Sequence, residues 1–246
     1  MLNKIHNMDC IEGMKEIPDK SIDMILCDLP YGRTHNKWDN VLSLNLLWEQ
    51  YNRIIKANGC IALFCDGLFM AELMLSNKKM WKYNLVWDKV LPSGFLNANR
   101  MPLRSHEEIA IFYKKQTTYN PQKNKGNPNH SKGSSERSLN NNYGVFKTVD
   151  NKEKLGDMKH PKSIVTVQKP HPSKMVHPTQ KPVELFEWLI KSYTNKGDIV
   201  LDSCIGSGTT AIACINTERN YIGFEISKEY CDIANKRLEE MKNGKL

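Results

Sequence analysis

Apolar runs alternate along the chain with stretches in which apolar residues recur at helical spacing. Runs typical of buried strands lie at 3–9, 21–28, 60–65, 83–89, 107–115, 198–202 and 221–225. Helical spacing predicts helices at 11–18, from Ser43 to a stop at Asn58-Gly59, and at 68–79, 182–194, 209–216 and 228–242. Strands interleaved with helices indicate an α/β fold, with a mostly parallel twisted sheet covered by helices on both faces.

One segment breaks this pattern. Residues 114–174 are rich in Asn, Lys, Ser, Gly and Pro and contain few apolar side chains. Such a segment is too polar to build a core of its own, and we interpret it as a small insertion. The predicted organisation is one half-domain at 1–113, the insertion at 114–174, and a second half of the same domain at 175–246.

Composition narrows the class of protein. With 246 residues and 40% hydrophobic residues, the chain is long and apolar enough for one large domain. It contains no apolar run of about 18 residues and no apolar signal segment at its start, so we expect no contact with a membrane. The seven cysteines form no C-x-x-C pair, which favours free thiols in the cytoplasm over disulfides or a metal site.

The positive charge is concentrated in the insertion. The whole chain has a formal charge of +8, and residues 114–174 hold thirteen Lys or Arg against four Asp or Glu. The rest of the chain is therefore close to neutral. A local excess of this size is typical of proteins that bind nucleic acid, although a solvated lysine-rich loop would show the same composition.

A glycine turn follows the predicted strand at 198–202, in the stretch "IVLDSCIGSGTT". Gly206 and Gly208 permit a sharp turn and a close approach of the backbone to a ligand. A phosphate-binding Walker loop requires a Lys after the second glycine, and none is present here. The third glycine of a dinucleotide site is missing as well. Asp202 beside the turn and Glu225 at the end of the next strand suit a nucleoside with a cationic tail, such as S-adenosylmethionine, better than NAD.

Four motifs together carry a resemblance to a known family. They are "NMDC" at 7–10, "DLPYG" at 28–32, "HPTQKPVEL" at 177–185 and "LDSCIGSGTT" at 201–210. By itself, "DLPYG" could be a plain strand end with a Pro-Gly turn. The set, in this order, resembles the β-class amino-methylating DNA methyltransferases, in which the motif order is circularly permuted. The resemblance covers everything except the insertion, and implies a Rossmann-like methyltransferase fold with S-adenosylmethionine as cofactor and no metal.

The resemblance also implies roles for individual residues. The catalytic residues are expected to be Asp28, Leu29, Pro30 and Tyr31. The cofactor is expected to bind Asp9, Cys10, Asp28, Thr179, Gln180, Lys181, Asp202, Ser203, Cys204, Gly206, Ser207, Gly208, Thr209, Glu225 and Ile226. In this scheme Asp9 takes the adenine amino group, Glu225 the ribose, and Lys181 the methionyl carboxylate. Plain alternatives are a helix cap for Glu225 and a surface lysine for Lys181.

DNA is the expected substrate and partner. The residues predicted to contact it are Arg104, His106, Lys123, Lys125, Lys132 and Arg137. Arg104 and His106 could equally belong to a simple loop that enters a strand. A homodimer and a cognate restriction endonuclease are further partners that the resemblance leaves open.

The chemistry explains why these residue types occur together. The lone pair of an exocyclic base amine is delocalised into the ring, so the amine needs acceptors aimed at its N–H bonds. Asp28 and a carbonyl of the Leu29-Pro30 turn supply them, and the ring of Pro30 fixes the turn. Tyr31 would stack on a base flipped out of the duplex.

The expected function is therefore transfer of a methyl group to N6 of adenine in DNA at specific sites. In the family, Asp in the first motif position accompanies adenine, whereas physical chemistry alone leaves N4 of cytosine open. Leu29, Ser203 and Cys204 depart from the family pattern, which usually has Pro, Pro and Phe there. A catalytically weakened nucleic-acid-binding relative, or a methyltransferase for RNA or protein, remains an alternative.

Overall fold

The computed structural model describes residues 1–30, 42–127, 157–170 and 180–243. The chain divides into a larger unit, Met1–Asn120 with Ser163–Leu246, and a smaller unit, Pro121–Lys162. The smaller unit lies inside the predicted insertion and has narrower bounds than 114–174. Residues after Lys162 belong to the larger unit because Val165 and Val167 are buried in its core.

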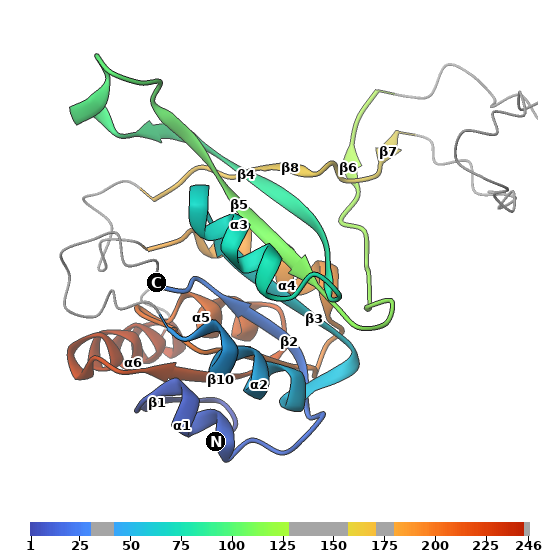
Figure 1. Ribbon diagram of the computed structural model, residues 1–246, viewed down its shortest axis with the longest axis vertical. Helices are drawn as coiled ribbons and strands as arrows, with labels where there is room; N and C mark the ends of the chain where they lie inside the picture. Colours follow the sequence, from blue (N-terminus) through green and yellow to red (C-terminus); the bar gives the residue numbers. More distant parts are fainter. Residues whose placement is uncertain (31–41, 128–156, 171–179, 244–246) are drawn as a thin grey trace, which may run out of the picture. The chain divides into compact units, whose positions relative to one another are not determined.

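The described residues of the larger unit form one eight-stranded sheet (Figure 1). Across the sheet the order is β1 (Lys4–Asn7), β10 (Asn220–Glu225), β9 (Ile199–Asp202), β2 (Ile22–Cys27), β3 (Ile55–Cys65), β5 (Arg104–Phe112), β4 (Trp81–Ser93) and β8 (Ile164–Thr166). Each neighbouring pair is parallel, except that β5 runs antiparallel to both β3 and β4. This confirms the predicted α/β class with a mostly parallel sheet.

Three helices cover each face of the sheet (Figure 1). One face packs on α1 (Cys10–Lys15), α2 (Leu44–Ile54) and α3 (Gly67–Ser76), and the other on α4 (Val183–Tyr193), α5 (Thr209–Asn216) and α6 (Lys228–Lys242). Alternation along a strand explains this division: Met24 and Leu26 of β2 enter one core, whereas Ile25 and Cys27 enter the other.

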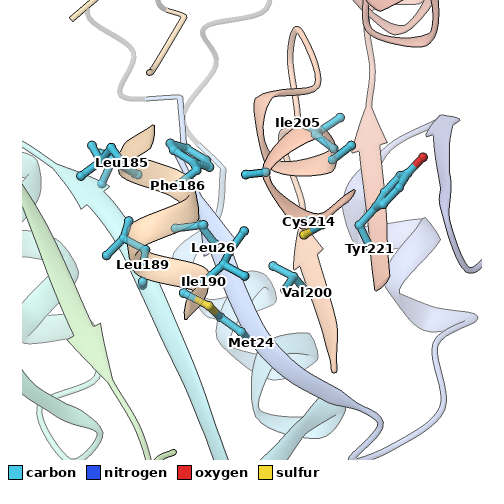
Figure 2. Close-up of a cluster of buried hydrophobic side chains, with 14 of the residues drawn as sticks. Met24, Leu26, Leu185, Phe186, Leu189, Ile190, Val200, Ile205, Cys214 and Tyr221 are labelled. Atoms are coloured by element: carbon cyan, nitrogen blue, oxygen red, sulfur yellow. The ribbon is translucent and has the colours of Figure 1, made fainter. Parts of the chain in front are cut away.

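Helix α4 shows how an apolar stripe becomes core. Leu185, Phe186, Leu189 and Ile190 are all buried, and Figure 2 shows them in one cluster with side chains of β2. Burial of one such side chain contributes on the order of 2 kcal/mol to stability. The stripe predicted from the sequence is confirmed, whereas the helix begins at Val183 and Pro182, predicted as its first residue, stands in the N-cap position without a side-chain hydrogen bond. The helix thereby anchors the residues that precede it, including Lys181.

Several predicted element ends were wrong. Helix α2 ends at Ile54 instead of Asn58-Gly59, because Ile55 already belongs to β3 and pairs with Ile22. The strand predicted at 83–89 extends to Ser93, and the strand predicted from residue 107 begins at Arg104. The two strands form a long hairpin whose backbone pairing continues to Ser93 and Arg104. Arg104 and His106 therefore lie on a strand, not in a loop.

The smaller unit contains one short antiparallel ribbon. Strands β6 (Asn124–Lys125) and β7 (Met158–Lys159) pair with each other. Lys125 lies 3.7 Å from Asp157, and the lysine side chain is largely exposed. Of the predicted DNA-binding residues, Lys125 thus belongs to this polar ribbon and Lys123 directly precedes it.

Candidate active site

Four acidic residues follow the carboxyl ends of four adjacent parallel strands. Asp28 follows β2, Asp202 ends β9, Glu225 ends β10, and Asp9 lies two residues after β1. From β9 the chain continues to its neighbour β10, toward the β1 side of the sheet. From β2 it continues to β3, toward the β8 side. The neighbouring strands β2 and β9 therefore mark the point at which the connections change direction. In open α/β sheets the crevice at such a point is the usual ligand site. The beginning and end of the sequence thus contribute to one edge.

The contact between β2 and β9 is direct. Ile25 pairs with Leu201. Two residues further along each segment, the Sγ atom of Cys27 lies 3.3 Å from Oγ of Ser203. Asp28 and the glycine turn therefore leave the sheet from adjacent strands. The two turns therefore begin side by side at the carboxyl ends of neighbouring strands.

The glycine turn needs its glycines for local geometry. Gly206 and Gly208 have φ values of 51° and 82°, in the left-handed region that disfavours other residues. A Cβ on Gly208 would also come within 3.0 Å of the Ala234 side chain in α6. The turn ends at the buried Thr209, which begins α5. Backbone N–H groups of such a turn can approach a ligand closely.

Asp202 is a buried carboxylate, with only 3% of its surface exposed. Its Oδ1 accepts from the backbone N–H of Cys204 at 3.0 Å, and Oδ2 accepts from the hydroxyl of Thr210. Burial raises its pKa to about 6, and these two bonds oppose the increase. No Lys or Arg of the described chain forms an ion pair with it. A cationic ligand beside Asp202 would supply the missing countercharge.

Glu225 and Asp9 hold backbone at the ends of their strands. Glu225 accepts from the N–H of Gly206 at 2.9 Å and from that of Ser227 at 2.8 Å, and burial raises its pKa. Asp9 caps α1, accepting from the N–H groups of Ile11 and Glu12. The N-cap of α6 is Ser227, whose hydroxyl accepts from the N–H of Tyr230, so Glu225 binds the cap residue and is not itself the helix cap proposed as its plain alternative.

The remaining predicted cofactor residues differ in exposure. Cys10 and Ser207 are buried, Cys204 is partly exposed, and Ile226 is exposed at the end of β10. Ser203 is buried as well, and its hydroxyl lies 2.6 Å from the hydroxyl of Tyr51. The Ser207 hydroxyl accepts from Arg237 at 3.0 Å. Ser203 and Ser207 thus fix the loop to the core.

The side chain of Lys181 lies beside Asp28 at the carboxyl ends of the parallel strands, which form the catalytic edge of the sheet. Its Nζ is 2.6 Å from Oδ2 of Asp28 and 3.2 Å from Oε2 of Glu107. Burial alone would lower the pKa of Lys181, but Asp28 and Glu107 raise it above its ordinary value. The ammonium also lies 5.2 Å from the ring centre of Phe64. The sequence assigned Lys181 to the methionyl carboxylate, whereas in the structure it contacts the proposed catalytic Asp28.

Glu107 and Lys89 extend this cluster, and the sequence analysis did not find them. Oε1 of Glu107 lies 3.3 Å from Nζ of Lys89. Burial would raise the pKa of Glu107, but Lys181 and Lys89 hold it below its ordinary value. A signal was present in the sequence: Lys89 follows the buried Trp87 by two residues, so it shares that residue's face of the strand. A charged residue in the period of a buried face needs a partner.

The structure places only part of the other predicted site. Leu29 is 3% exposed and packs in the core, and Pro30 is partly buried beside it. Gln180 is described, whereas Tyr31 and Thr179 lie outside the described residues, as do Lys132 and Arg137. Arg104 is 56% exposed and forms an ion pair with Asp66 at the start of α3. His106 is exposed on the same hairpin.

The described residues lack two features that would have changed the interpretation of the site: a metal-binding cluster and a membrane-spanning helix. No group of three or more His, Cys, Asp or Glu side chains is placed to hold a metal ion. No helix in that part of the chain has the length and apolar character needed to cross a membrane. All seven cysteines are free, and six of them are buried.

Comparisons with known proteins agree with this geometry. The model of a family described as DNA methylase matches residues 22–236. The Type II methyltransferase M1.MboII of Moraxella bovis is 29% identical over 256 residues, which cover 98% of this chain and 98% of that protein. The match thus spans both halves of the larger unit and the insertion between them.

Solved structures show the same similarity in three dimensions. The crystal structure of the M1.HpyAVI-SAM complex superposes with a TM-score of 0.64 at 28% identity, covering 95% of this chain and 98% of the other. The PvuII DNA methyltransferase, described as cytosine-N4-specific, gives a TM-score of 0.66 at 15% identity, covering 95% and 85%. At that identity the second comparison concerns the fold alone.

Proposed function

The chain belongs to the DNA methylase family, and from this premise we propose that it transfers a methyl group from S-adenosylmethionine to the N6 amino group of adenine in DNA. One observation carries the proposal. The Asp28 turn and the glycine turn leave adjacent parallel strands at the point where the sheet connections change direction. An amine held by Asp28 would therefore lie next to a ligand held by the glycine turn.

The residues at this edge fit S-adenosylmethionine. The buried Asp202 has no cationic partner among the described residues, and the ligand would bring positive charge to it. Gly206 and Gly208 allow close approach, and the exposed Ile226 offers an apolar surface beside Glu225. When bound, the cofactor supplies a methyl group on a positively charged sulfur. The chain's own residues would bind it, exclude water and orient the amine.

Asp28 would perform the positioning step at the amine. Its carboxylate accepts one N–H bond, a carbonyl of the Leu29-Pro30 turn accepts the other, and the nitrogen lone pair then points away from both acceptors. Acceptors fixed where positive charge develops are worth a few kcal/mol each. The proton leaves the nitrogen after transfer, so Asp28 need not be a strong base.

The departures from the family pattern are accommodated by packing. Leu29 is buried among apolar side chains, and the hydroxyl of Ser203 hydrogen bonds to Tyr51. These contacts support an intact site and argue against a weakened, purely DNA-binding relative. The partly exposed Cys204 replaces a phenylalanine, which leaves a smaller apolar wall.

The choice of base and the partners are further parts of the proposal. Asp in the first motif position favours adenine, because in the family it accompanies that base. DNA is the expected substrate, and the basic insertion would supply contacts to phosphate and base edges. A second copy of the chain and a cognate restriction endonuclease are proposed as further partners. The free thiols suit the reducing cytoplasm.

A single experiment tests catalysis and base together. Purified protein is incubated with DNA of mixed sequence and methyl-labelled S-adenosylmethionine, and the DNA is digested to nucleosides for mass spectrometry. We expect labelled N6-methyladenine, and a loss of at least 100-fold in the Asp28→Ala variant. Sequencing of the methylated DNA then gives the recognition site.

Other products identify the alternatives. N4-methylcytosine as the sole product would overturn the adenine assignment but keep the family. DNA binding without any labelled base, together with no binding of the cofactor, would favour a non-catalytic relative. Label in RNA or protein, but not in DNA, would contradict the proposed substrate.

A further inference from the structure

Two lysines and two acids form a line of alternating charge that ends at Asp28. Lys181 lies between Asp28 and Glu107, and Glu107 lies between Lys181 and Lys89, with separations of 2.6, 3.2 and 3.3 Å. The four residues come from four different parts of the fold. Asp28 follows β2, Lys181 precedes α4, Glu107 is on β5, and Lys89 is on β4. Only Asp28 and Lys181 belong to motifs singled out in the sequence.

Burial makes these charges strongly dependent on one another. The side chains of Lys89 and Lys181 are 5% and 11% exposed, and that of Glu107 is 21% exposed. Partly desolvated charges interact more strongly than surface charges, and removal of one partner leaves another uncompensated. The side chain of Lys181 is therefore held between two carboxylates, in a place that neither would fix alone.

Glu107 also sets the charge next to Asp28. Asp28 and Lys181 form a neutral pair, which is a weak acceptor for an amine that develops positive charge. Glu107 touches the same ammonium and shares its positive charge with Asp28, so the Asp28 carboxylate is less fully compensated than in a pair with Lys181 alone, while Lys89 makes the four groups neutral overall. Oε2 of Glu107 is buried and meets no hydrogen-bond donor in favourable geometry among the described residues, so its attraction for Lys181 is ionic.

We propose that Glu107 is a positioning residue for methyl transfer, which holds Lys181 in the place from which Lys181 orients the Asp28 carboxylate. The inference rests on the proposed function of Asp28. It replaces the expectation that Lys181 serves the methionyl carboxylate, because both near contacts of its Nζ are protein carboxylates. Lys89 holds the other oxygen of Glu107 and completes the arrangement.

The test compares two adjacent glutamates on β5. Glu107→Gln removes the charge that faces Lys181 while keeping the shape of the side chain. Glu108→Gln makes the same change on the opposite face of the strand, where Glu108 accepts from Asn84 at 2.6 Å. Single-turnover methyl transfer to DNA and the dissociation constant for S-adenosylmethionine are measured for both. Single turnover is chosen because product release limits many steady-state rates.

We expect the transfer rate of Glu107→Gln to fall on the order of 10- to 100-fold, the size of effect that small displacements of a catalytic group produce. Its dissociation constant for the cofactor should stay within about twofold of wild type, since no cofactor contact is lost. Glu108→Gln should match wild type in both. An unchanged rate in Glu107→Gln would overturn the proposal. So would weakened cofactor binding that accounts for the whole loss.

Two further measurements cover loss of folding and failure of the proposed function. If Glu107→Gln unfolds, the double variant Glu107→Gln with Lys89→Gln removes a matched pair of charges and should fold with the same rate defect. A rate equal to wild type in the double variant would reject the positioning role. If wild type methylates no DNA, the proposed function fails on its own. Crystal structures of wild type and Glu107→Gln then test whether Lys181 moves relative to Asp28, and no movement would reject the inference.

Discussion

At the scale of single residues, the acidic side chains of the site have two different roles. Two of them hold backbone N–H groups of loops, and one would contact the substrate. Asp202 and Glu225 each bind backbone N–H groups of the glycine turn or its neighbour. Asp28 instead contacts Lys181. Binding of a cation by Asp202 is consistent with its burial, because an ionised carboxylate in that place lacks a positive partner among the described residues. Stability and cofactor binding therefore make opposite demands on this carboxyl group.

The variant Asp202→Asn tests this conflict. The pKa of Asp202 is about 6 in the folded protein against an ordinary value of 3.8, so ionisation above pH 6 weakens folding. As pH falls from about 6 to 4, the folded protein takes up a proton before the unfolded chain does, and stability from this group rises. Asp202→Asn should therefore exceed wild type at pH 8 by about 1 to 3 kcal/mol in unfolding free energy, and the difference should vanish near pH 4.

Urea unfolding at several pH values measures this difference, and titration with S-adenosylmethionine should show weaker binding by the variant. Asp198→Asn, at the start of the same strand, is the matched control for loss of a carboxylate, because Asp198 bonds a local backbone N–H instead of the glycine turn. A variant that is less stable than wild type at pH 8 would contradict the assignment. The two hydrogen bonds to Asp202 would then outweigh its burial.

At the scale of elements, the β4–β5 hairpin does more than its sequence indicates. It brings Lys89 and Glu107 to the edge where Asp28 emerges, and it carries the exposed Arg104 further along the same strand. Because β4 is parallel to β2, the end of β4 lies at the carboxyl edge of the sheet. DNA that presents a base to Asp28 must approach this edge, so the hairpin is a natural phosphate contact.

Arg104→Gln should weaken binding to DNA of any sequence. Loss of one phosphate contact should make the dependence of log affinity on log salt shallower by about 0.9. Stability should change by about 1 kcal/mol, because the Arg104 side chain of the ion pair with Asp66 is 56% exposed. Fluorescence anisotropy measures the affinity at salt concentrations from about 50 to 300 mM, where screening of charges changes strongly, and these affinities give the slope.

Lys79→Gln is the control, since Lys79 is exposed in the turn before β4, at the opposite edge of the sheet. It should bind DNA as wild type does. A salt slope for Arg104→Gln equal to that of wild type would show that the hairpin does not touch the DNA backbone. Equal slopes for both variants, each shallower than wild type, would indicate binding by general charge alone.

At the scale of the whole molecule, chemistry and charge are separated. The acids, the glycine turn and the lysine pair belong to the larger unit, whereas the positive excess belongs to the insertion that contains the smaller unit. This separation predicts that affinity for DNA and the rate of the chemical step can be changed independently. DNA affinity is therefore tested with variants of the smaller unit, and the rate of the chemical step with variants of the larger unit.

Lys123→Gln combined with Lys125→Gln removes two positive charges from the smaller unit. The double variant should bind DNA more weakly, with a salt dependence shallower by up to about 1.8. Its single-turnover rate at saturating DNA should stay close to wild type, since no residue of the catalytic edge changes. Lys228→Gln with Lys236→Gln removes two exposed charges from α6 and should bind as wild type does. A reduced rate at saturating DNA would contradict the separation.

The sequence by itself predicted seven of the ten strands that the structure describes, its six described α-helices and the motifs of the candidate site, but not β6, β7 and β8. Short apolar runs, the left-handed glycines and the linked motifs depend on local chain geometry, so they are readable in order along the chain. Asp28 was identified from its motif, and Asp202 and Glu225 from their places beside the glycine turn and at the end of the next strand. Local signals fail where the backbone pairing of a strand continues beyond its run of buried apolar residues. This is why the predicted ends of the hairpin strands and of α2 were wrong.

Only the tertiary structure decided which charges meet. Lys181 lies 153 residues from Asp28 in sequence, and its partner Glu107 reaches it because antiparallel β5 is inserted between β3 and β4. Strand order of this kind follows from long-range packing, and no periodicity in the sequence encodes it. The residues proposed to hold the cofactor were therefore found from motifs. The residues that orient Asp28 emerge only when the sheet is assembled, because their energy comes from contacts between distant segments.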